Sequence, residues 1–268
     1  MNESIKESIN EIMNESTESI DETINESPDE WLIKQAVIFI ILNIVSLLFL
    51  LMTFMVYSIL PELRNIHGYM LRRYVGSLFV GGIFYLVIQL IEIPNIGNYA
   101  CFVIAFVTYF FLLASYFWLN VISFDMWQTF RKFRPLQGNV KQRERKKIVL
   151  YSIYAWGSPI ILVVVCGIME FVPNLSENLI RPRFGVDYCW FSEDMAIILY
   201  CYVPMSINII SSICLSIYTA LKITRSEKES AHHLRDVDSR RHNDNKQWFN
   251  LYLKLFIVMF SVSLSLWA

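Results

Sequence analysis

The stretch CFVIAFVTYFFLLASYFWLNVISFDMWQTFRKFR, residues 101–134, decides the fold of this chain. It begins with Cys101, and residues 102–124 carry no formal charge. A helix of about 20 apolar residues crosses a bilayer whose hydrocarbon core is about 30 Å thick, so this stretch is long enough to span a membrane. Three basic residues follow the apolar part, Arg131, Lys132 and Arg134.

Three polar side chains interrupt the half of this stretch nearest the cations: Asn120, Ser123 and Asp125. A polar or ionised group that faces lipid is costly, so we expect these side chains to face protein or water. Cys101 lies at the opposite end from the cations, which predicts that it faces outward, where disulfides form.

The composition of the chain is that of a membrane protein. Of its 268 residues, 55% are apolar and only 18% are charged, and the mean hydropathy is +0.42. The charged residues are bunched between long apolar runs, which is typical of membrane spans and not of one soluble core.

Sequence motifs of several other function classes are absent from the chain. It has no P-loop, no H-E-x-x-H, no G-x-S-x-G and no TVGYG filter sequence. The apolar runs also lack the spaced arginines of a voltage sensor and the chains of acids of proton-coupled transporters. We therefore expect neither an enzyme nor a channel or transporter, and we expect no cofactor, metal or nucleic acid.

Six apolar runs are predicted to be transmembrane helices, over residues 31–58, 69–93, 101–124, 148–172, 195–221 and 251–268. Pro204 is expected to kink or interrupt the fifth helix. The sixth run is at the lower margin of the length needed for crossing, and no polar tail follows it. The predicted fold class is an all-α membrane bundle with six spans present, and we expect a further span in a complete protein.

Residues 1–30 form an acidic segment with ten Asp or Glu residues and one basic residue, Lys6. Isoleucines spaced mostly three and four apart indicate a weak amphipathic helix, whereas the low apolar content favours a disordered tail. Four N-x-S sequons are glycosylation candidates if they lie outside the cell: Asn2, Asn14, Asn25 and Asn174.

The basic residues predict the orientation of the chain in the membrane. Of the 23 Lys and Arg residues, 19 lie in or beside the segments after the first, third and fifth spans, and the other four are Lys6, Lys34, Arg181 and Arg183. Because basic residues concentrate on the cytoplasmic side, we predict a multi-pass plasma-membrane protein with an extracellular amino terminus.

On this topology Cys101 and Cys189 share the outer side, at the start of the third span and in the loop of residues 173–194. We predict a disulfide between them that holds this loop across the mouth of the bundle and contributes about 2–4 kcal/mol. Two free thiols are the alternative. The other three cysteines lie within spans and are predicted to be small buried apolar residues: Cys166, Cys201 and Cys214.

Two features of the inner side leave alternatives open. His67 at the start of the second span could contact neighbouring helix ends as a cytoplasmic latch, or it could be an interfacial polar residue without a switching role. The basic inner surface is either a docking face for an acidic partner or anionic lipid, or the topology signal alone.

The sequence Trp156-Gly157-Ser158-Pro159 in the fourth span is interpreted as a packing motif. Glycine permits close approach of a neighbouring helix, and tryptophan fills the groove beside it. Proline is expected to bend the helix.

The order of these features resembles the G-protein-coupled receptors. The segments Leu63-Arg64-Asn65-Ile66-His67, Phe117-Trp118-Leu119, Trp156-Gly157-Ser158-Pro159 and Cys189-Trp190 resemble the secretin-like (class B) receptors. More narrowly, LRNIHG (63–68), FWLNVISFDMWQTFR (117–131) and FGVDYCWF (184–191) are similar to the Methuselah-like branch of insect receptors. The resemblance covers residues 31–268 and implies a seven-transmembrane bundle without its last helix.

Two departures from the family pattern are visible. The wider class pairs the histidine of helix 2 with a glutamate in helix 3, and alignment on Phe117-Trp118 places Ile122 at that position, which weakens the transfer of this latch. Family members usually carry a folded, cysteine-bearing ectodomain, whereas no cysteine precedes Cys101.

The resemblance implies a receptor that passes a signal from an extracellular ligand, a peptide or a small molecule, to a heterotrimeric G protein. A non-signalling truncated membrane protein or a receptor-associated scaffold is the alternative. Candidates for the ligand mouth are Glu92, Asp187, Trp190 and Phe191. Candidates for coupling at the inner face are Arg64, His67, Arg131, Arg134 and Lys254.

Overall fold

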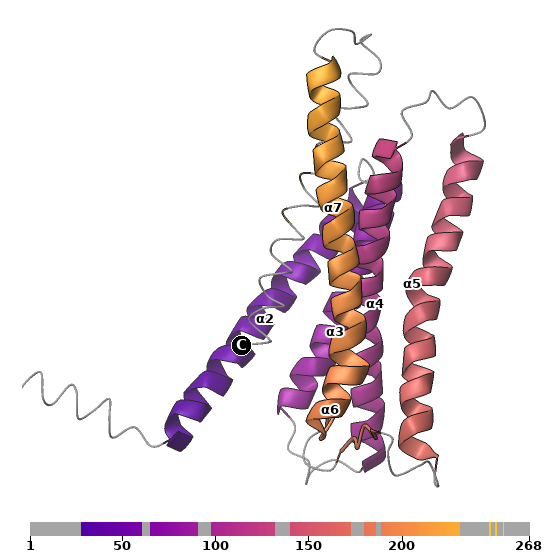
Figure 1. The fold of residues 1–268 in the computed structure, drawn as a ribbon. Helices are drawn as coiled ribbons and strands as arrows, with labels where there is room; N and C mark the ends of the chain where they lie inside the picture. The colour runs from indigo at the N-terminus through magenta and orange to yellow at the C-terminus, as the bar shows by residue number, and fades with distance from the viewer. Residues whose placement is uncertain are drawn as a thin grey trace, which may run out of the picture. The chain divides into compact units, whose positions relative to one another are not determined.

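The fold is a set of long helices, as the apolar runs predict. The computed structural model describes residues 28–60, 65–90, 98–131, 140–172, 180–185 and 189–230, together with residues 247, 250 and 254. Within these residues, five helical segments are long and apolar enough to cross a membrane (Figure 1). The all-α membrane architecture is therefore confirmed, whereas the predicted sixth span lies outside the described residues except for Lys254.

The five segments follow one another along the chain. They are α2 (Pro28–Ile59), α3 (Ile66–Leu90), α4 (Asn98–Arg131), α5 (Val140–Phe171) and a composite of α6 (Asp194–Ala196), the π-helix η3 (Ile197–Tyr202) and α7 (Val203–Ser230). We define the basic end as the helix ends at Ile66, Arg131, Val140 and Ser230. The disulfide end comprises the opposite ends at Leu90, Asn98, Phe171 and Asp194.

Asn65 determines where α3 begins. Its side-chain Oδ1 accepts a hydrogen bond from the backbone N–H of Gly68 at 2.7 Å, and its carbonyl accepts one from Tyr69 at 2.9 Å. Asparagine is a preferred residue for capping the otherwise unpaired N–H groups of a helix start. His67 consequently lies in the first turn of α3 and not in a loop.

Two segments predicted as polar connections are partly helical. The predicted fourth span begins at residue 148, but α5 begins at Val140, and α7 continues past the predicted end at residue 221 to Ser230. Lys, Arg, Glu and Gln are good helix formers, so a helix that starts or ends in lipid can continue into the polar region beside it. Hydropathy marks the apolar part of such a helix and not its end.

The fifth segment is interrupted near Pro204, as predicted. Residues Ile197–Tyr202 form a π-helix directly before α7. Pro204 has no N–H, so it cannot donate to the carbonyl of Tyr200 one turn earlier. The hydroxyl of Tyr109 on α4 donates to that carbonyl instead, at 2.7 Å. A side chain of the neighbouring helix thus satisfies the backbone group that the proline leaves without its usual partner.

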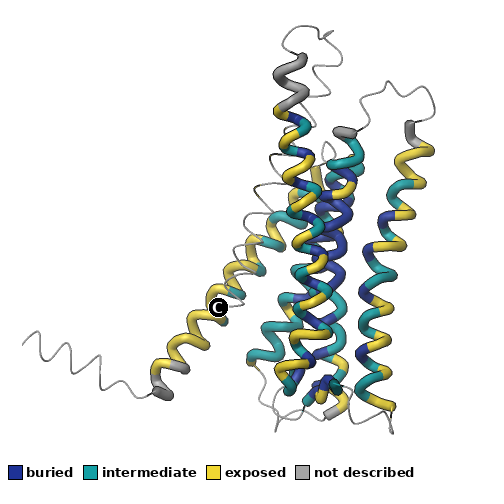
Figure 2. The backbone as a smooth tube through the Cα atoms, in the orientation of Figure 1, coloured by how far each residue is buried: buried dark blue, intermediate teal, exposed yellow. Residues whose placement is uncertain are grey.

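α4 is the most buried of the helices that pack together. Half of the residues in the most apolar 18-residue stretch of α4 are buried. In α3, in α5 and in the segment from α6 to α7, 22% or less of the corresponding stretch is buried. Figure 2 shows buried residues along most of α4, whereas exposed residues alternate along α5. The long apolar stretch that begins at Cys101 therefore forms the central helix.

α2 passes from one structural unit, residues 1–46, into a second unit, residues 47–268. In its first part, apolar side chains such as Ile33 and Ile38 are exposed, as in a helix surrounded by lipid. In its second part, Leu50, Phe54 and Tyr57 pack against the apolar core shared by α3, α4 and α5.

The close helix contact lies at a glycine other than the one predicted. A Cβ atom at Gly157 would meet nothing within 4 Å, so the interpretation of Gly157 as a close-approach site is wrong. At Gly81 on α3, a Cβ would lie 3.3 Å from Cβ of Phe111 on α4. Trp156 packs as predicted, with its ring 5.8 Å from that of Phe110 and 6.0 Å from that of Trp118.

Candidate functional site

The carboxylate of Asp125 is the centre of a buried polar cluster at the basic end. Asp125 is 1% exposed. The Nζ atom of Lys147 lies 3.1 Å from its Oδ1, and the hydroxyl of Tyr151 donates to the same oxygen at 2.9 Å. The Nδ1 atom of His67 lies 3.4 Å from Oδ2. We call these four residues the Asp125 cluster.

The Asp125 cluster connects three helices through one side chain. Asp125 belongs to α4, His67 to α3, and Lys147 and Tyr151 to α5. A buried carboxylate without partners costs several kcal/mol, so the burial of Asp125 depends on the groups that surround it. Moving α3 or α5 away from α4 at this end would remove part of that compensation.

The structure confirms the predicted burial of the polar residues of α4. Asn120, Ser123 and Asp125 are 8%, 1% and 1% exposed, so none of them faces lipid. The hydroxyl of Ser123 donates to the carbonyl of Leu119 in the same helix at 3.0 Å. Asn120 and Asp125 contact other helices.

Ile122 explains why the sequence did not reveal the partner of His67. Ile122 is 5% exposed and belongs to the apolar core shared by α3, α4 and α5, so an acid is indeed absent from that position. Asp125 lies three residues further along α4, on the same face of the helix one turn nearer the basic end. The three-residue spacing from Ile122 to Asp125 could have pointed to Asp125 as the partner of His67. Using it would have required the register of α3 against α4, which the sequence does not give.

A second set of polar contacts joins α4 to α7. The Nδ2 atom of Asn120 lies 3.4 Å from the carbonyl oxygen of Asn208 and 3.4 Å from Oγ of Ser212. The side chain of Asn208 in turn donates to the carbonyl of Pro204 at 2.8 Å. Together with the bond from Tyr109 to Tyr200, these contacts hold η3 and the adjoining half of α7 against α4.

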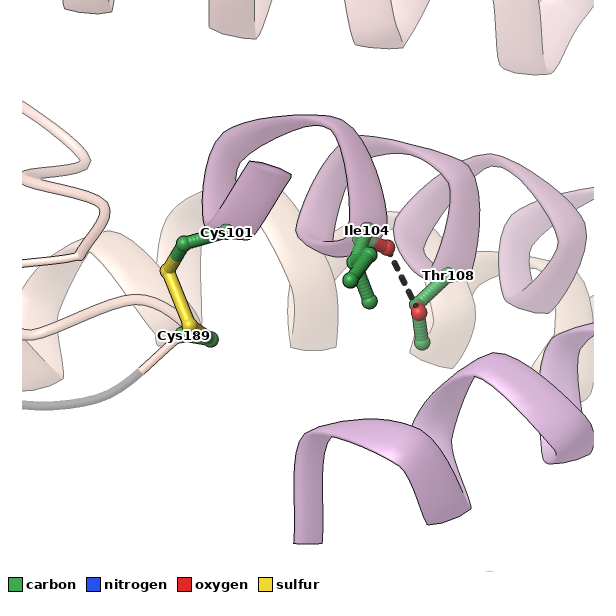
Figure 3. Close-up of a disulfide and its surroundings, with 4 residues drawn as sticks. All are labelled: Cys101, Ile104, Thr108 and Cys189. Atoms are coloured by element: carbon green, nitrogen blue, oxygen red, sulfur yellow. Dashed lines mark hydrogen bonds between the residues drawn. A yellow bond between two sulfur atoms is a disulfide. The ribbon is translucent and has the colours of Figure 1, made fainter. Parts of the chain in front are cut away.

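Cys101 and Cys189 form a disulfide, as predicted, with their Cα atoms 5.2 Å apart (Figure 3). It joins the first turn of α4 to the loop before α6. Figure 3 also shows Thr108 further along α4, whose hydroxyl donates to the carbonyl of Ile104 at 2.8 Å. Thr108 is fully buried, and this hydrogen bond satisfies its hydroxyl within its own helix.

The two aromatic candidates for the ligand mouth differ in their surroundings. Phe191 is 3% exposed, and its ring lies 4.3 Å from that of Phe184 and 5.5 Å from that of Tyr109. Trp190 is half-buried beside Phe191. Phe191 therefore belongs to the core beneath the loop, while part of Trp190 is accessible. A role in ligand binding stays a prediction for both residues.

Among the coupling candidates, the structure gives contacts for His67 alone. Lys254 is exposed, and the backbone of Arg131 forms the last residue of α4. The other candidates lie outside the described residues: Arg64, Arg134, Glu92, Asp187 and the sequons at Asn2, Asn14, Asn25 and Asn174.

The three remaining cysteines are free thiols, and two of them match their prediction. Cys166 and Cys201 are buried in the apolar core at the disulfide end. Cys214 is exposed, so its predicted burial is wrong. It lies on the face of α7 away from α4, whereas Ser212 and Ser216 on either side of it in the sequence are buried.

Comparison with known proteins assigns a family. A family model described as "7 transmembrane receptor (Secretin family)" matches residues 32–265. The chain is 34% identical over 217 residues to "G-protein coupled receptor Mth2" of Drosophila yakuba, a match that covers 80% of the chain and 40% of that receptor. It is 33% identical over 229 residues to "G-protein coupled receptor Mth" of Drosophila melanogaster, covering 82% of the chain and 42% of that receptor. The chain thus spans less than half the length of these relatives.

Proposed function

The chain belongs to the secretin family of seven-transmembrane receptors, and from this membership we propose that it forms the membrane part of a signalling receptor. It would pass a signal from an extracellular ligand to a heterotrimeric G protein at the basic end. The match to Methuselah-type receptors favours this function over a non-signalling scaffold.

The Asp125 cluster is the observation that carries the mechanism. It ties the ends of α3, α4 and α5 together on the side that holds most of the basic residues. A receptor that alternates between two packings needs contacts that exist in one packing and not in the other. We assign the cluster to the resting packing, where it limits separation of the helix ends.

The basic end suits an acidic partner surface. Arg143, Arg145 and Lys146 are exposed at the start of α5, and Arg73 is exposed near the start of α3. Complementary charge guides association and sets orientation more than it sets affinity. We propose that the G protein docks here, and that Arg64, Arg131, Arg134 and Lys254 extend this surface.

The opposite end is the proposed ligand side. We propose that the chain lies in the plasma membrane with its amino terminus outside, because the 19-to-4 distribution of basic residues follows the positive-inside rule. Glu92, Asp187 and Trp190 remain candidates for ligand contact there, and Phe191 would support the loop from beneath.

Replacing Arg64 and Arg131 together by glutamine tests the coupling surface. We expect G-protein activation to fall about tenfold or more at equal surface expression, because two charges that face an acidic partner are lost. Lys6→Gln in the amino-terminal segment, which has no part in the proposed docking surface, is the control and should leave activation unchanged. Full activation by the double variant would show that these arginines are not part of the docking surface.

A further inference from the structure

Glu170, near the end of α5, holds the loop that precedes α6. Its Oε2 accepts a hydrogen bond from the backbone N–H of Arg183 at 2.8 Å. Its Oε1 accepts one from the backbone N–H of Phe184 at 3.3 Å. One carboxylate thus binds two successive N–H groups of a segment that is distant in sequence.

The loop backbone at this point has a conformation that needs support. Arg183 has a φ of 48°, the left-handed region that residues other than glycine rarely adopt. Two successive N–H groups in such a turn point to one side and form a concavity that binds an anion. The Glu170 carboxylate fills this concavity and supplies the acceptors that favour the strained turn.

The same loop segment is fixed at three further points. Phe184 and Phe191 form an antiparallel bridge, and both rings are buried. Tyr200 donates to the carbonyl of Ile180 at 3.1 Å. The disulfide joins Cys189 to the start of α4. Glu170 is the contact from α5, so the loop is held by three helical segments at once.

We propose that Glu170 is the positioning residue of this loop. Its carboxylate selects the turn at Arg183, and this turn places Phe184 among the buried aromatic rings that cover the disulfide end of α4. If the chain is the receptor proposed above, the loop is a fixed surface that an extracellular ligand meets, and Glu170 determines its shape. The assignment deepens that function, but its test reads the loop directly and does not depend on signalling.

Cleavage by trypsin after Arg183 measures how firmly the turn is held. Arg183 is exposed, and the neighbouring Arg181 precedes Pro182, which protects that bond from trypsin. Cleavage there gives two fragments, residues 1–183 and 184–268, and the disulfide keeps them linked. Cleavage among the basic residues 131–147 also falls between the two cysteines, so the product of cleavage after Arg183 is identified after reduction by its new amino terminus at Phe184.

The experiment uses the full chain in microsomes opened with mild detergent, so that no variant has to reach the cell surface. We expect Glu170→Gln, which keeps the shape but only one acceptor oxygen, to be cleaved about tenfold faster than the unaltered chain. Glu170→Ala should be cleaved faster still. Glu193→Gln is the matched control, because Glu193 lies in the same loop and its side chain makes no capping bond.

The thermal unfolding midpoint distinguishes a local effect of Glu170 on the loop from a general loss of stability of the bundle. Glu170→Gln should leave the thermal unfolding midpoint in detergent close to that of the control while its cleavage rate rises. Cleavage of both Glu170 variants at the control rate would overturn the assignment. So would a fall in the unfolding midpoint large enough to account for the faster cleavage, because the loop would then open with the whole bundle.

Discussion

The Nδ1 atom of His67 lies 3.4 Å from Oδ2 of Asp125, across the contact between α3 and α4. Asp125 is 1% exposed, and its carboxylate also accepts hydrogen bonds from Lys147 and Tyr151 of α5. The histidine near the start of α3 is therefore not an isolated interfacial residue. It belongs to a buried electrostatic contact that joins the ends of three helices.

Asp125→Asn should increase ligand-independent signalling. The substitution keeps the size of the side chain but removes the charge that binds Lys147 and His67. Hydrogen bonds to a charged group contribute about 1.5–3 kcal/mol, so loss of this contact should shift the population away from the resting packing about tenfold. Basal G-protein activation, normalised to surface expression, is the measurement.

Asp194→Asn is the control for this substitution, because Asp194 is an exposed carboxylate at the disulfide end. It should leave basal signalling unchanged. If Asp125→Asn signals no more than this control, the Asp125 cluster does not restrain the receptor.

Tyr109→Phe should destabilise the bundle by about 1 kcal/mol, because it removes the donor to the carbonyl of Tyr200. The loss should be smaller in a chain that also carries Pro204→Ala, since alanine supplies the N–H that proline lacks. The measurement is a double-mutant cycle on thermal unfolding in detergent, which isolates the coupling between the two sites. Strictly additive effects would mean that the Tyr109 hydroxyl does not compensate for Pro204.

Gly185→Ala and Gly157→Ala should change stability in opposite directions. Gly185 has a φ of 73°, and a Cβ there would lie 3.3 Å from Sγ of Cys101. The left-handed conformation alone costs alanine about 1–2 kcal/mol. At Gly157 a Cβ meets nothing within 4 Å, so alanine should stabilise α5 by about 0.5–1 kcal/mol.

Unfolding midpoints of the two glycine variants in the same detergent provide the comparison. Equal midpoints, or a stabilised Gly185→Ala chain, would contradict the backbone geometry of the loop.

The orientation predicts glycosylation of the amino-terminal segment. Asn14→Gln should remove one glycosidase-sensitive step in gel mobility, because an extracellular segment passes through the compartment where N-x-S sequons are modified. A new sequon in the segment between α4 and α5 should stay unmodified and serves as the control. Modification of that new sequon, with none at Asn14, would reverse the predicted topology.

Several features could be predicted because they depend on short stretches of sequence. The central span, the burial of Asn120, Ser123 and Asp125, and the interruption near Pro204 each follow from hydropathy or from the chemistry of one residue. The disulfide followed from two cysteines that the charge distribution placed on one side. The start of α5 and the end of α7 were not predicted, because a helix can continue through charged residues beyond its apolar part.

The contacts between helices could not be predicted in the same way. Sequence reasoning identified His67 but found no acidic partner for it, because Ile122 occupies the position of the family's glutamate. It also assigned close packing to Gly157 when Gly81 makes that contact. Glu170 was not singled out at all, although it holds two backbone groups of a distant loop.

The sequence by itself determined which segments enter the membrane, because the free energy of transfer into lipid is a sum over residues in one stretch. It also determined the expected direction of those segments, because basic residues are distributed unevenly between the two sides. Only the tertiary structure decided that Asp125 meets His67 and Lys147, and that Glu170 meets the turn at Arg183. These pairs depend on the rotation and register of one helix against another, and a shift of one turn moves a side chain by about 5.4 Å to a different partner.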